Sequence, residues 1–539
     1  MGLLFWLVAA PLLAAIVILL VPKASIGFYK TIALLGLLVS VLLDIVTWAS
    51  YDTSATTFQH VSSIPWFTLP GVWLGANATI GLSFGADGMS LALLSLGIAI
   101  SLFVVLAVPV RHGGHRAYLF WVMLISTGIC GVFLALDLFT FLFALELSLF
   151  STFFLIYLFG EKGRKKAAFK FLIYRGFATV LLILAFVGAA YGASGGLSPK
   201  ADGLPPMNPA MTGGQTTPAM QTLLHQAHAT YVSFNVPTLM HSMHSVPTSV
   251  FPTSWRMGLF LVLLFAVFIE EAFVPFHTWF PTTSETAETG TNMLIGGILT
   301  KTGAYVLIRF GVGLFPDQVR AAGTFIAIIG VINILYGAFA AWAQRDWRRL
   351  ITFSSISHMG IVLLGIASMT SAGLQGAMFM LISSGLLTAL LFYVTSAMRE
   401  RTQTIFIPSM GGLSKPMPML SGFLLVAALG SLGLPLTSGF ISEFQSFIGG
   451  FHTYPAISFV GVIGLILSAT YMLYAIQKTT FGPLNGPLPA AETGQYDAKP
   501  IEYIPIIALT AMVLLIGVYP DVIGSLFNPS VHALIGIGG

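Results

Sequence analysis

The sequence has few charged residues and a single cysteine, and each scarcity excludes a class of protein. Charged residues make up 8% of the 539 positions, whereas soluble domains carry about a quarter, so we expect no soluble domain. Cys130 stands alone, which excludes a disulfide framework and a cysteine-based metal or iron–sulfur site. No glycine-rich phosphate loop follows a strand-like segment, so we expect no flavin or nicotinamide bound to this chain. The composition is instead 56% hydrophobic.

The apolar residues form runs that are long enough to cross a bilayer. A span needs about 20 residues, and this criterion predicts about fourteen helices. Their approximate extents are 2–22, 29–49, 86–110, 117–134, 138–159, 166–192, 256–280, 290–314, 321–343, 348–368, 373–398, 417–448, 456–478 and 503–527. The first run lacks a basic flank and a small-residue cleavage site, which indicates a retained span. The predicted fold class is an all-α polytopic membrane protein.

Lysine and arginine gather in alternate loops. These loops contain Lys23 and Lys30; Arg111 and Arg116; Lys162, Arg164, Lys165 and Lys166; Arg345, Arg348 and Arg349; Arg399, Arg401 and Lys415; and Lys478. By the positive-inside rule they face the cytoplasm, so both termini lie on the outer side. We expect an integral protein of a bacterial-type inner membrane. Its partner is the lipid bilayer and not nucleic acid.

Four ionisable residues lie inside the predicted spans, namely Glu146, Glu270, Lys301 and Glu443. A charge at this depth costs a few kcal/mol, about 2.5 or more, so such residues usually serve function. Any one of them alone would be explained by an ion pair that fastens helices together. Four in one chain indicate an ion or proton path.

Two predicted spans contain breaks. Pro275 follows Glu270 in the seventh span, and Gly433 and Pro435 precede Glu443 in the twelfth. Proline removes a backbone donor and frees carbonyl groups at membrane depth. One isolated proline would indicate a simple kink, but here each break has a carboxylate within about two turns.

The breaks lie five spans apart, a spacing typical of inverted repeats in transporters. We therefore predict two inverted five-helix repeats, each with one broken helix. The predicted divisions are helices 1–3 (residues 1–116), a first repeat of helices 4–8 (117–314, with an outward loop at 193–255), a second repeat of helices 9–13 (321–478), and a C-terminal loop with helix 14 (479–539).

The outward loop contains His225, His228, His241 and His244. The last two are three residues apart, as zinc ligands can be, but no carboxylate or cysteine accompanies them. We interpret the segment as a polar loop and predict no metal site.

The sequence contains five distinctive motifs. They are residues 277–281 (HTWFP), 297–305 (GILTKTGAY) with Arg309, 87–90 (DGMS), 346–349 (DWRR) and 354–360 (SSISHMG). Together they resemble the motifs of the antiporter-like subunits of respiratory complex I and of Mrp-type cation/proton antiporters. The resemblance covers spans three to thirteen. Two features resemble one branch of these subunits, the chain M type. One is Glu443, a glutamate in place of a lysine in the twelfth span, and the other is Arg401 followed by Gly411–Leu413.

The resemblance implies a role for each buried charge. Glu146 matches a fifth-span glutamate that biases a neighbouring basic group, Lys301 matches a central eighth-span lysine, and Glu443 matches a terminal carboxylate. Such groups pass protons when the pKa of each responds to the charge of its neighbour. We add Arg175, His277 and His358 to this predicted relay.

The sequence also departs from the family pattern. Glu270 stands where the family has a lysine, with Ala272 where a proline is usual, so the family's glutamate–lysine pair cannot form. Arg175 in the sixth span could supply the missing positive charge, and we predict that it pairs with Glu146 or Glu270. The alternative is that the long side chain of Arg175 reaches out to the cytoplasmic face.

Two further departures lie towards the outlet and the cytoplasmic loop. Ser384 replaces a usual histidine, so the outlet half of the path would depend on water and on His358. Residues 284–288 replace an acid, histidine and proline pattern.

The resemblance implies a proton-translocating membrane-arm subunit of NADH:quinone oxidoreductase. Its partners would be the other membrane subunits, sibling antiporter-like subunits among them, and flavin, iron–sulfur clusters and quinone would belong to partner subunits. Three alternatives share the fold: an Mrp-type antiporter subunit, the corresponding subunit of a membrane-bound hydrogenase or formate hydrogenlyase, and a structural subunit that has lost transport. Retention of Lys301 and Glu443 argues against the last.

Overall fold

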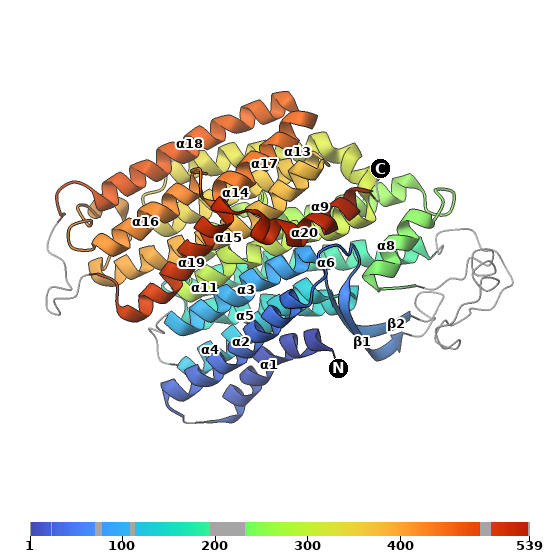
Figure 1. The fold of residues 1–539 in the computed structure, drawn as a ribbon, viewed down its shortest axis with the longest axis horizontal. Coiled ribbons are helices and arrows are strands. Elements are labelled where there is room, and N and C mark those ends of the chain that lie inside the picture. Colours follow the sequence, from blue (N-terminus) through green and yellow to red (C-terminus); the bar gives the residue numbers. More distant parts are fainter. Residues whose placement is uncertain are drawn as a thin grey trace.

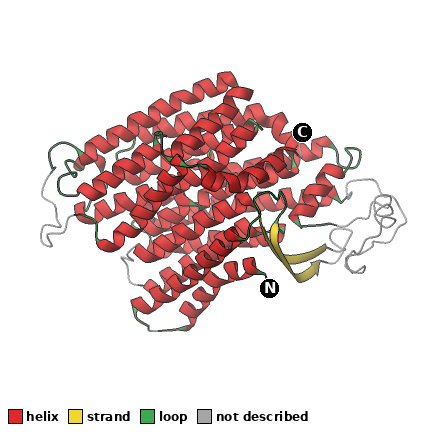
Figure 2. Cartoon of the chain, in the orientation of Figure 1, coloured by secondary structure: helices red, strands yellow, loops and turns green. Residues whose placement is uncertain are grey.

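The computed structural model describes residues 2–22, 24–69, 78–107, 114–194, 232–485 and 497–536. They form a bundle of long, roughly parallel helices with one small hairpin at its end (Figures 1 and 2). The helices are α1 (Leu3–Leu20), α2 (Ile26–Ala49), α3 (Gly88–Ala107), α4 (His115–Leu134), α5 (Leu138–Phe159), α6 (Arg164–Ala193), α8 (Val236–Ser245), α9 (Thr253–Glu270), α10 (Trp279–Thr286), α11 (Thr289–Gly297), α12 (Thr302–Val306), α13 (Pro316–Trp342), α14 (Trp347–Ala367), α15 (Ser371–Thr402), α16 (Pro418–Ser431), α17 (Ser438–Thr453), α18 (Pro455–Thr480), α19 (Pro500–Val518) and α20 (Asp521–Gly536).

The predicted all-α membrane fold is confirmed. Thirteen helical stretches within the described residues are long and apolar enough to cross a membrane, and the shorter α16 with α17 accounts for the broken twelfth span. The stretches of α14, α15 and residues 289–312 are wholly buried, whereas only a third of α2 and of α18 is. The centre of the bundle is therefore built from the eighth, tenth and eleventh spans.

The seventh span is interrupted between α9 and α10, with a single 3₁₀ turn, η2 (Phe276–Thr278), in the gap. The backbone turns at Ala272, whose φ is 58°. Neighbouring side chains satisfy the groups that the break frees: Val274 N donates to Asn333 Oδ1 at 2.8 Å, and Trp279 Nε1 donates to the carbonyl of Ile269 at 2.9 Å. A polar break at membrane depth is stable because its backbone groups find such partners.

The twelfth span is interrupted between α16 and α17. Gly433 has φ +68° there, and a Cβ at this position would collide with the carboxylate of Glu443. The left-handed backbone favours glycine here, and the absence of a side chain also leaves space for the carboxylate of Glu443.

The eighth span is not the single regular helix that the sequence predicts over 290–314. It consists of α11, a 3₁₀ turn η3 (Leu299–Lys301), α12 and a π-helical turn η4 (Leu307–Val312). This irregularity lies in a wholly buried span, and 3₁₀ and π segments inside helices are frequent at functional sites. The length of an apolar run in the sequence does not predict such an irregularity in the helix.

Four other elements were not predicted. Strands β1 (Gln59–Leu69) and β2 (Ala78–Ala86) form an antiparallel hairpin ahead of α3, in a segment too polar to register as a span. The short helix α8 belongs to the segment interpreted as a polar loop, and α20 follows a fourteenth span that ends at Val518 and not near residue 527. The hairpin, α8 and both ends of the chain lie at the same end of the bundle (Figure 1).

Candidate functional site

The first group of predicted site residues meets beside the break in the seventh span. Arg175 from α6 and Glu270 at the end of α9 form an ion pair, with both side chains 2% exposed. The prediction that Arg175 pairs with a buried glutamate is confirmed for Glu270. The alternative, that Arg175 reaches out to the cytoplasmic face, is wrong.

Further contacts fix the arginine in place. Its guanidinium donates to the carbonyl of Leu299 at 3.4 Å and to Thr302 Oγ1 at 3.3 Å, and it lies over the rings of Phe171 and Trp279. Arginine keeps its charge in proteins, so the site holds a permanent positive charge at this point.

Glu146 on α5 is half-buried, and its charge repels that of Glu270. It forms no ion pair with any residue that the structure describes. The sixth-span cation is thus bound to Glu270 and not to Glu146.

Lys301 lies in η3 and is completely buried. Its ammonium donates to the carbonyl of Gly296 at 2.8 Å, to Thr300 Oγ1 at 3.2 Å and to Ser355 Oγ at 3.3 Å. The carbonyl is available because the helix changes to a 3₁₀ turn just after it. The irregular eighth span therefore creates the binding site of its own lysine.

Glu271 is a site residue that the sequence analysis missed. It is 1% exposed, and its charge attracts that of Lys301. Its Oε1 accepts a hydrogen bond from Ala304 N at 2.6 Å. The only sequence signal was its place next to Glu270 in the break, which does not tell which of two adjacent glutamates faces the lysine.

Polar side chains continue from Lys301 to the second break. Ser355 is adjacent on α14 to Ser354, which accepts a hydrogen bond from Tyr471 Oη at 2.8 Å, and the charge of Glu443 acts on Tyr471. Glu443 is 9% exposed and makes no hydrogen bond or ion pair within the described part of the chain.

His358 also belongs to this second half. Its ring interacts electrostatically with Lys301, and Nε2 donates to the carbonyl of Ser431, the last residue of α16, at 3.2 Å. Ser384 on α15 is buried, and its hydroxyl has no hydrogen-bond partner among the described residues; the hydroxyl of the neighbouring Ser383 is hydrogen-bonded to that of Ser438 at 2.7 Å. Ser384 therefore stands in the place of the family's histidine, next to a pair of hydroxyl groups that joins α15 to the start of α17.

His277 lies apart from Lys301. It sits in η2, its Nε2 is 3.1 Å from Tyr336 Oη, and its buried Nδ1 has no partner among the described residues. Lys170 is its electrostatic neighbour. No hydrogen bond in the described part of the chain joins His277 to the Lys301 group.

Within the described residues no three His, Cys, Asp or Glu side chains are grouped as a metal site would need. His241 and His244 belong to α8, and His225 and His228 lie outside the described residues.

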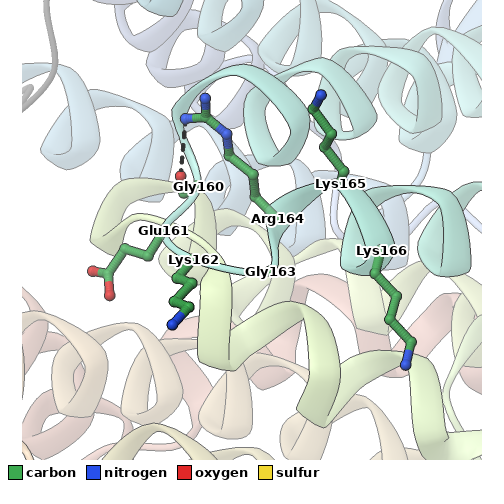
Figure 3. Close-up of a pocket in the computed structure, with 7 residues that line it drawn as sticks. All are labelled: Gly160, Glu161, Lys162, Gly163, Arg164, Lys165 and Lys166. Atoms are coloured by element: carbon green, nitrogen blue, oxygen red, sulfur yellow. Dashed lines mark hydrogen bonds between the residues drawn. The ribbon is translucent and has the colours of Figure 1, made fainter.

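A second ion cluster lies at the end of the bundle that carries the basic loops. Glu161, between α5 and α6, binds Arg399 of α15 through two hydrogen bonds of 2.5 and 3.0 Å, and Arg348 of α14 through one of 3.0 Å. It also borders a surface hollow of about 670 Å³ lined by residues 160–166. In Figure 3 the basic side chains there spread in different directions and do not converge.

This cluster predicts a pH-dependent contribution to stability. Burial alone would raise the pKa of Glu161, but hydrogen bonds from Arg399 and the charge of Arg348 lower it to about 2. Because the folded pKa lies below the unfolded value, the stabilisation is present above pH 4.5 and is lost as pH falls towards 2. We expect Glu161→Gln to lower the free energy of unfolding by roughly 1.5–3 kcal/mol at neutral pH.

The measurement is the thermal unfolding of the purified protein from pH 7 downwards. The gap between wild type and Glu161→Gln should narrow below about pH 4.5. Asp317→Asn, which removes an exposed carboxylate, is the matched control. A constant gap over this range would show that the cluster does not titrate as described.

The family model of NADH:quinone oxidoreductase/Mrp antiporter transmembrane subunits matches residues 135–468, which include both breaks and every predicted site residue. The chain belongs to this family.

Its relatives include "NAD(P)H-quinone oxidoreductase chain 4 2" of Synechococcus elongatus, at 31% identity over 98% of this chain and 91% of the relative. "NAD(P)H-quinone oxidoreductase chain 4 1" of Microcystis aeruginosa is 32% identical over 98% and 93%. The chloroplastic chain 4 of Chlorokybus atmophyticus is 30% identical over 98% and 95%. The resemblance to the M branch, whose members are the chain 4 subunits, is confirmed.

Solved structures share the fold. A chain of respiratory complex I from Thermus thermophilus superposes with a TM-score of 0.79 at 23% identity, covering 99% of this chain and all of that one. A chain of the Mrp complex from Dietzia sp. gives 0.77 at 18% identity, covering 100% and 99%.

Proposed function

We propose that this chain carries protons across the membrane through a relay that runs from the first break to the second. The chain is a membrane subunit of an NAD(P)H-quinone oxidoreductase of the complex I type. The observation that carries the relay is the row of buried ionisable groups between the two breaks, with Lys301 at its centre. The members we assign to it are Glu146, Arg175, Glu270, Lys301, His358 and Glu443, with His277 on a separate approach.

Charge coupling makes such a row conduct. Two unit charges 4 Å apart at an effective dielectric constant of 20 interact by about 4 kcal/mol, which changes a protonation equilibrium about a thousandfold. A proton arriving at or leaving one group therefore alters the proton affinity of the next. The hydroxyl groups of Ser354, Ser355 and Tyr471 can both donate and accept, so they suit the intervening steps.

The division into two inverted repeats is part of the proposal, with boundaries at 117–314 and 321–478. One feature that supports it is the start of the second helix in each unit. Asp137 caps α5 by accepting from Phe139 N at 2.9 Å, and Asp346 caps α14 by accepting from Arg348 N at 2.8 Å. Each aspartate also forms an isolated β-bridge with a loop, Asp137 with Asn235 and Asp346 with Phe406.

The partners follow from the absence of redox chemistry in the sequence. We assign flavin, iron–sulfur clusters and quinone to other subunits, and we place sibling antiporter-like subunits beside this one. The membrane is a bacterial-type cell membrane, with both termini on its outer side because the basic loops face the cytoplasm.

The Mrp-type antiporter subunit remains the second candidate because it shares the fold at a TM-score of 0.77. The corresponding subunit of a membrane-bound hydrogenase or formate hydrogenlyase is a third candidate. A chain of the membrane-bound sulfane sulfur reductase, an archaeal respiratory membrane complex, shares the fold at a TM-score of 0.75 and 20% identity. The relatives at 30–32% identity over nearly the whole chain favour the quinone oxidoreductase.

The test is a gentle affinity purification of this chain from its native membrane, with identification of every co-purifying subunit and an assay of NADH:quinone reduction. We expect flavin and iron–sulfur subunits and active NADH oxidation. Recovery with small antiporter subunits alone, or with a nickel hydrogenase, would overturn the assignment in favour of the corresponding alternative.

A further inference from the structure

We propose that Glu271 is the carboxylate that exchanges a proton with Lys301, and that the adjacent Glu270 is a fixed counter-ion of Arg175. The inference rests on the proposed function, because it names a further residue of the same path. It separates two neighbouring glutamates by what each one contacts.

Glu270 is unsuited to exchange because its partner cannot give up a proton. Arg175 is buried, stays charged, and is held by Leu299, Thr302 and two aromatic rings. The charge of Arg175 stabilises the ionised form of Glu270, against the opposing effects of burial and of the Glu146 charge. Glu270 and Arg175 therefore belong to the relay as a fixed pair of opposite charges and do not carry the proton themselves.

Glu271 lies at the point where the helix stops. It caps α9, and the left-handed turn at Ala272 follows immediately, so its side chain leaves the helix in a different direction from that of Glu270. Of the charged groups that act on Glu271, Lys301 has the largest electrostatic effect, ahead of Arg175 and Glu270. Among the described residues it is the carboxylate whose charge acts on Lys301.

The two carboxylate oxygens of Glu271 have different surroundings. Oε1 is fixed by the hydrogen bond from Ala304 N, whereas Oε2 is buried and has no partner among the described residues. A buried, unpartnered carboxylate oxygen is costly unless it serves a purpose. Glu270 Oε1 is also buried without a hydrogen-bond partner, but Glu270 is ion-paired with Arg175, whereas Glu271 forms no ion pair among the described residues. Glu271 Oε2 is therefore the oxygen that we assign as the proton acceptor.

Gly303 allows this arrangement. A Cβ at this position would lie 2.9 Å from Glu271 Cγ and 3.3 Å from Oε1, closer than the packing tolerates. Only glycine lets the backbone of the eighth span approach the break closely enough to fix the carboxylate. Gly303 lies in the first turn of α12, two residues after Lys301 and one before Ala304. The same short segment therefore contains Lys301 and binds the carboxylate of Glu271.

The step itself is a simple proton transfer. The N–H bond of the Lys301 ammonium breaks, the electron pair stays on Nζ, and an O–H bond forms at Glu271 Oε2. The charged pair becomes a neutral pair, so no net charge is created in the low-dielectric interior. Reversal of the step recharges Lys301, from which a proton can also leave towards His358. Lys301 Nζ and Glu271 form no direct hydrogen bond or ion pair among the described residues, so a bridging water relays the proton: it accepts the proton of Nζ and gives one of its own to Oε2.

Glu271→Gln in the intact complex tests the assignment. Glutamine keeps the shape of the side chain and can still accept the Ala304 hydrogen bond, but it cannot take a proton. We expect normal assembly and an approximately tenfold or greater fall in proton translocation through this subunit, the lower range of general acid–base effects. Glu271→Asp, which keeps a carboxylate, should restore a measurable part of it. Glu285→Gln, an exposed carboxylate of α10, is the matched control and should change nothing.

The outcomes separate this inference from the proposed function. Normal translocation by Glu271→Gln, together with loss of translocation by Lys301→Ala, would overturn the role of Glu271 and leave the relay standing. Normal translocation by both variants would overturn the relay itself. If Glu271 were merely structural, Glu271→Gln would match the wild type and Glu271→Asp, with its shorter reach, would be the worse of the two.

Discussion

Replacing Arg175 by leucine is expected to destabilise the assembled protein by about 3–5 kcal/mol, the usual cost of leaving a buried charge without its partner. The reason is Glu270, which keeps its place at the end of α9 and has Arg175 as its ion-pair partner. The repulsion from Glu146 would then be uncompensated. The readout is the amount of assembled complex in the membrane and its thermal unfolding in detergent.

A double variant separates the loss of the ion pair from the effect of leaving one charge buried without its partner. Arg175→Leu combined with Glu270→Leu removes both charges and keeps apolar volume, so most of the lost stability should return. Arg320→Leu, an arginine whose ion pair is largely exposed, is the control and should cost within about 1 kcal/mol. If Arg175→Leu assembled and translocated protons normally, the ion pair would have no part in the site.

Replacing Glu443 by glutamine is the second large expected effect, and it acts on transport without an effect on stability. Glu443 has no hydrogen-bond or ion-pair partner in the described part of the chain, and Gly433 leaves room for its carboxylate. Glutamine has nearly the same volume, so the complex should assemble and unfold as the wild type does. Because the variant cannot carry a proton at the second break, translocation should fall by about tenfold or more.

The readout is dye-monitored acidification of sealed vesicles during NADH oxidation, with Glu443→Asp as the conservative variant. Glu443→Asp should retain part of the activity because it keeps the carboxylate. Equal rates in wild type and Glu443→Gln would place the outlet of the path elsewhere.

Much of the fold followed from the sequence because its signals are local. A run of about 20 apolar residues must be helical in lipid, so the spans were predictable from composition alone. Pro275 and Pro435 marked the breaks for a similarly local reason, since proline cannot continue a helical hydrogen-bond ladder. The pairing of Arg175 was predictable from charge balance, because a buried glutamate in the place of a lysine requires a cation from elsewhere.

The rest depended on tertiary contacts. The 3₁₀ and π turns around Lys301 form because neighbouring helices satisfy the freed backbone groups, and no short segment encodes that. Likewise, Glu270 and Glu271 are adjacent and chemically identical in the sequence. Their separation into a partner of Arg175 and a partner of Lys301 follows from the end of α9 and the backbone turn at Ala272. The hairpin β1–β2 was not predicted because its strands are shorter than a membrane span and contain both polar and apolar residues.

The most direct test of the central claim is the ratio of protons translocated to electrons transferred, measured side by side for the intact wild-type complex and for Lys301→Ala in sealed vesicles. Lys301 is wholly buried and joins the two halves of the path, so the account predicts an assembled complex with a lower ratio. An assembled Lys301→Ala complex with the ratio of the wild type would contradict proton transfer through this chain.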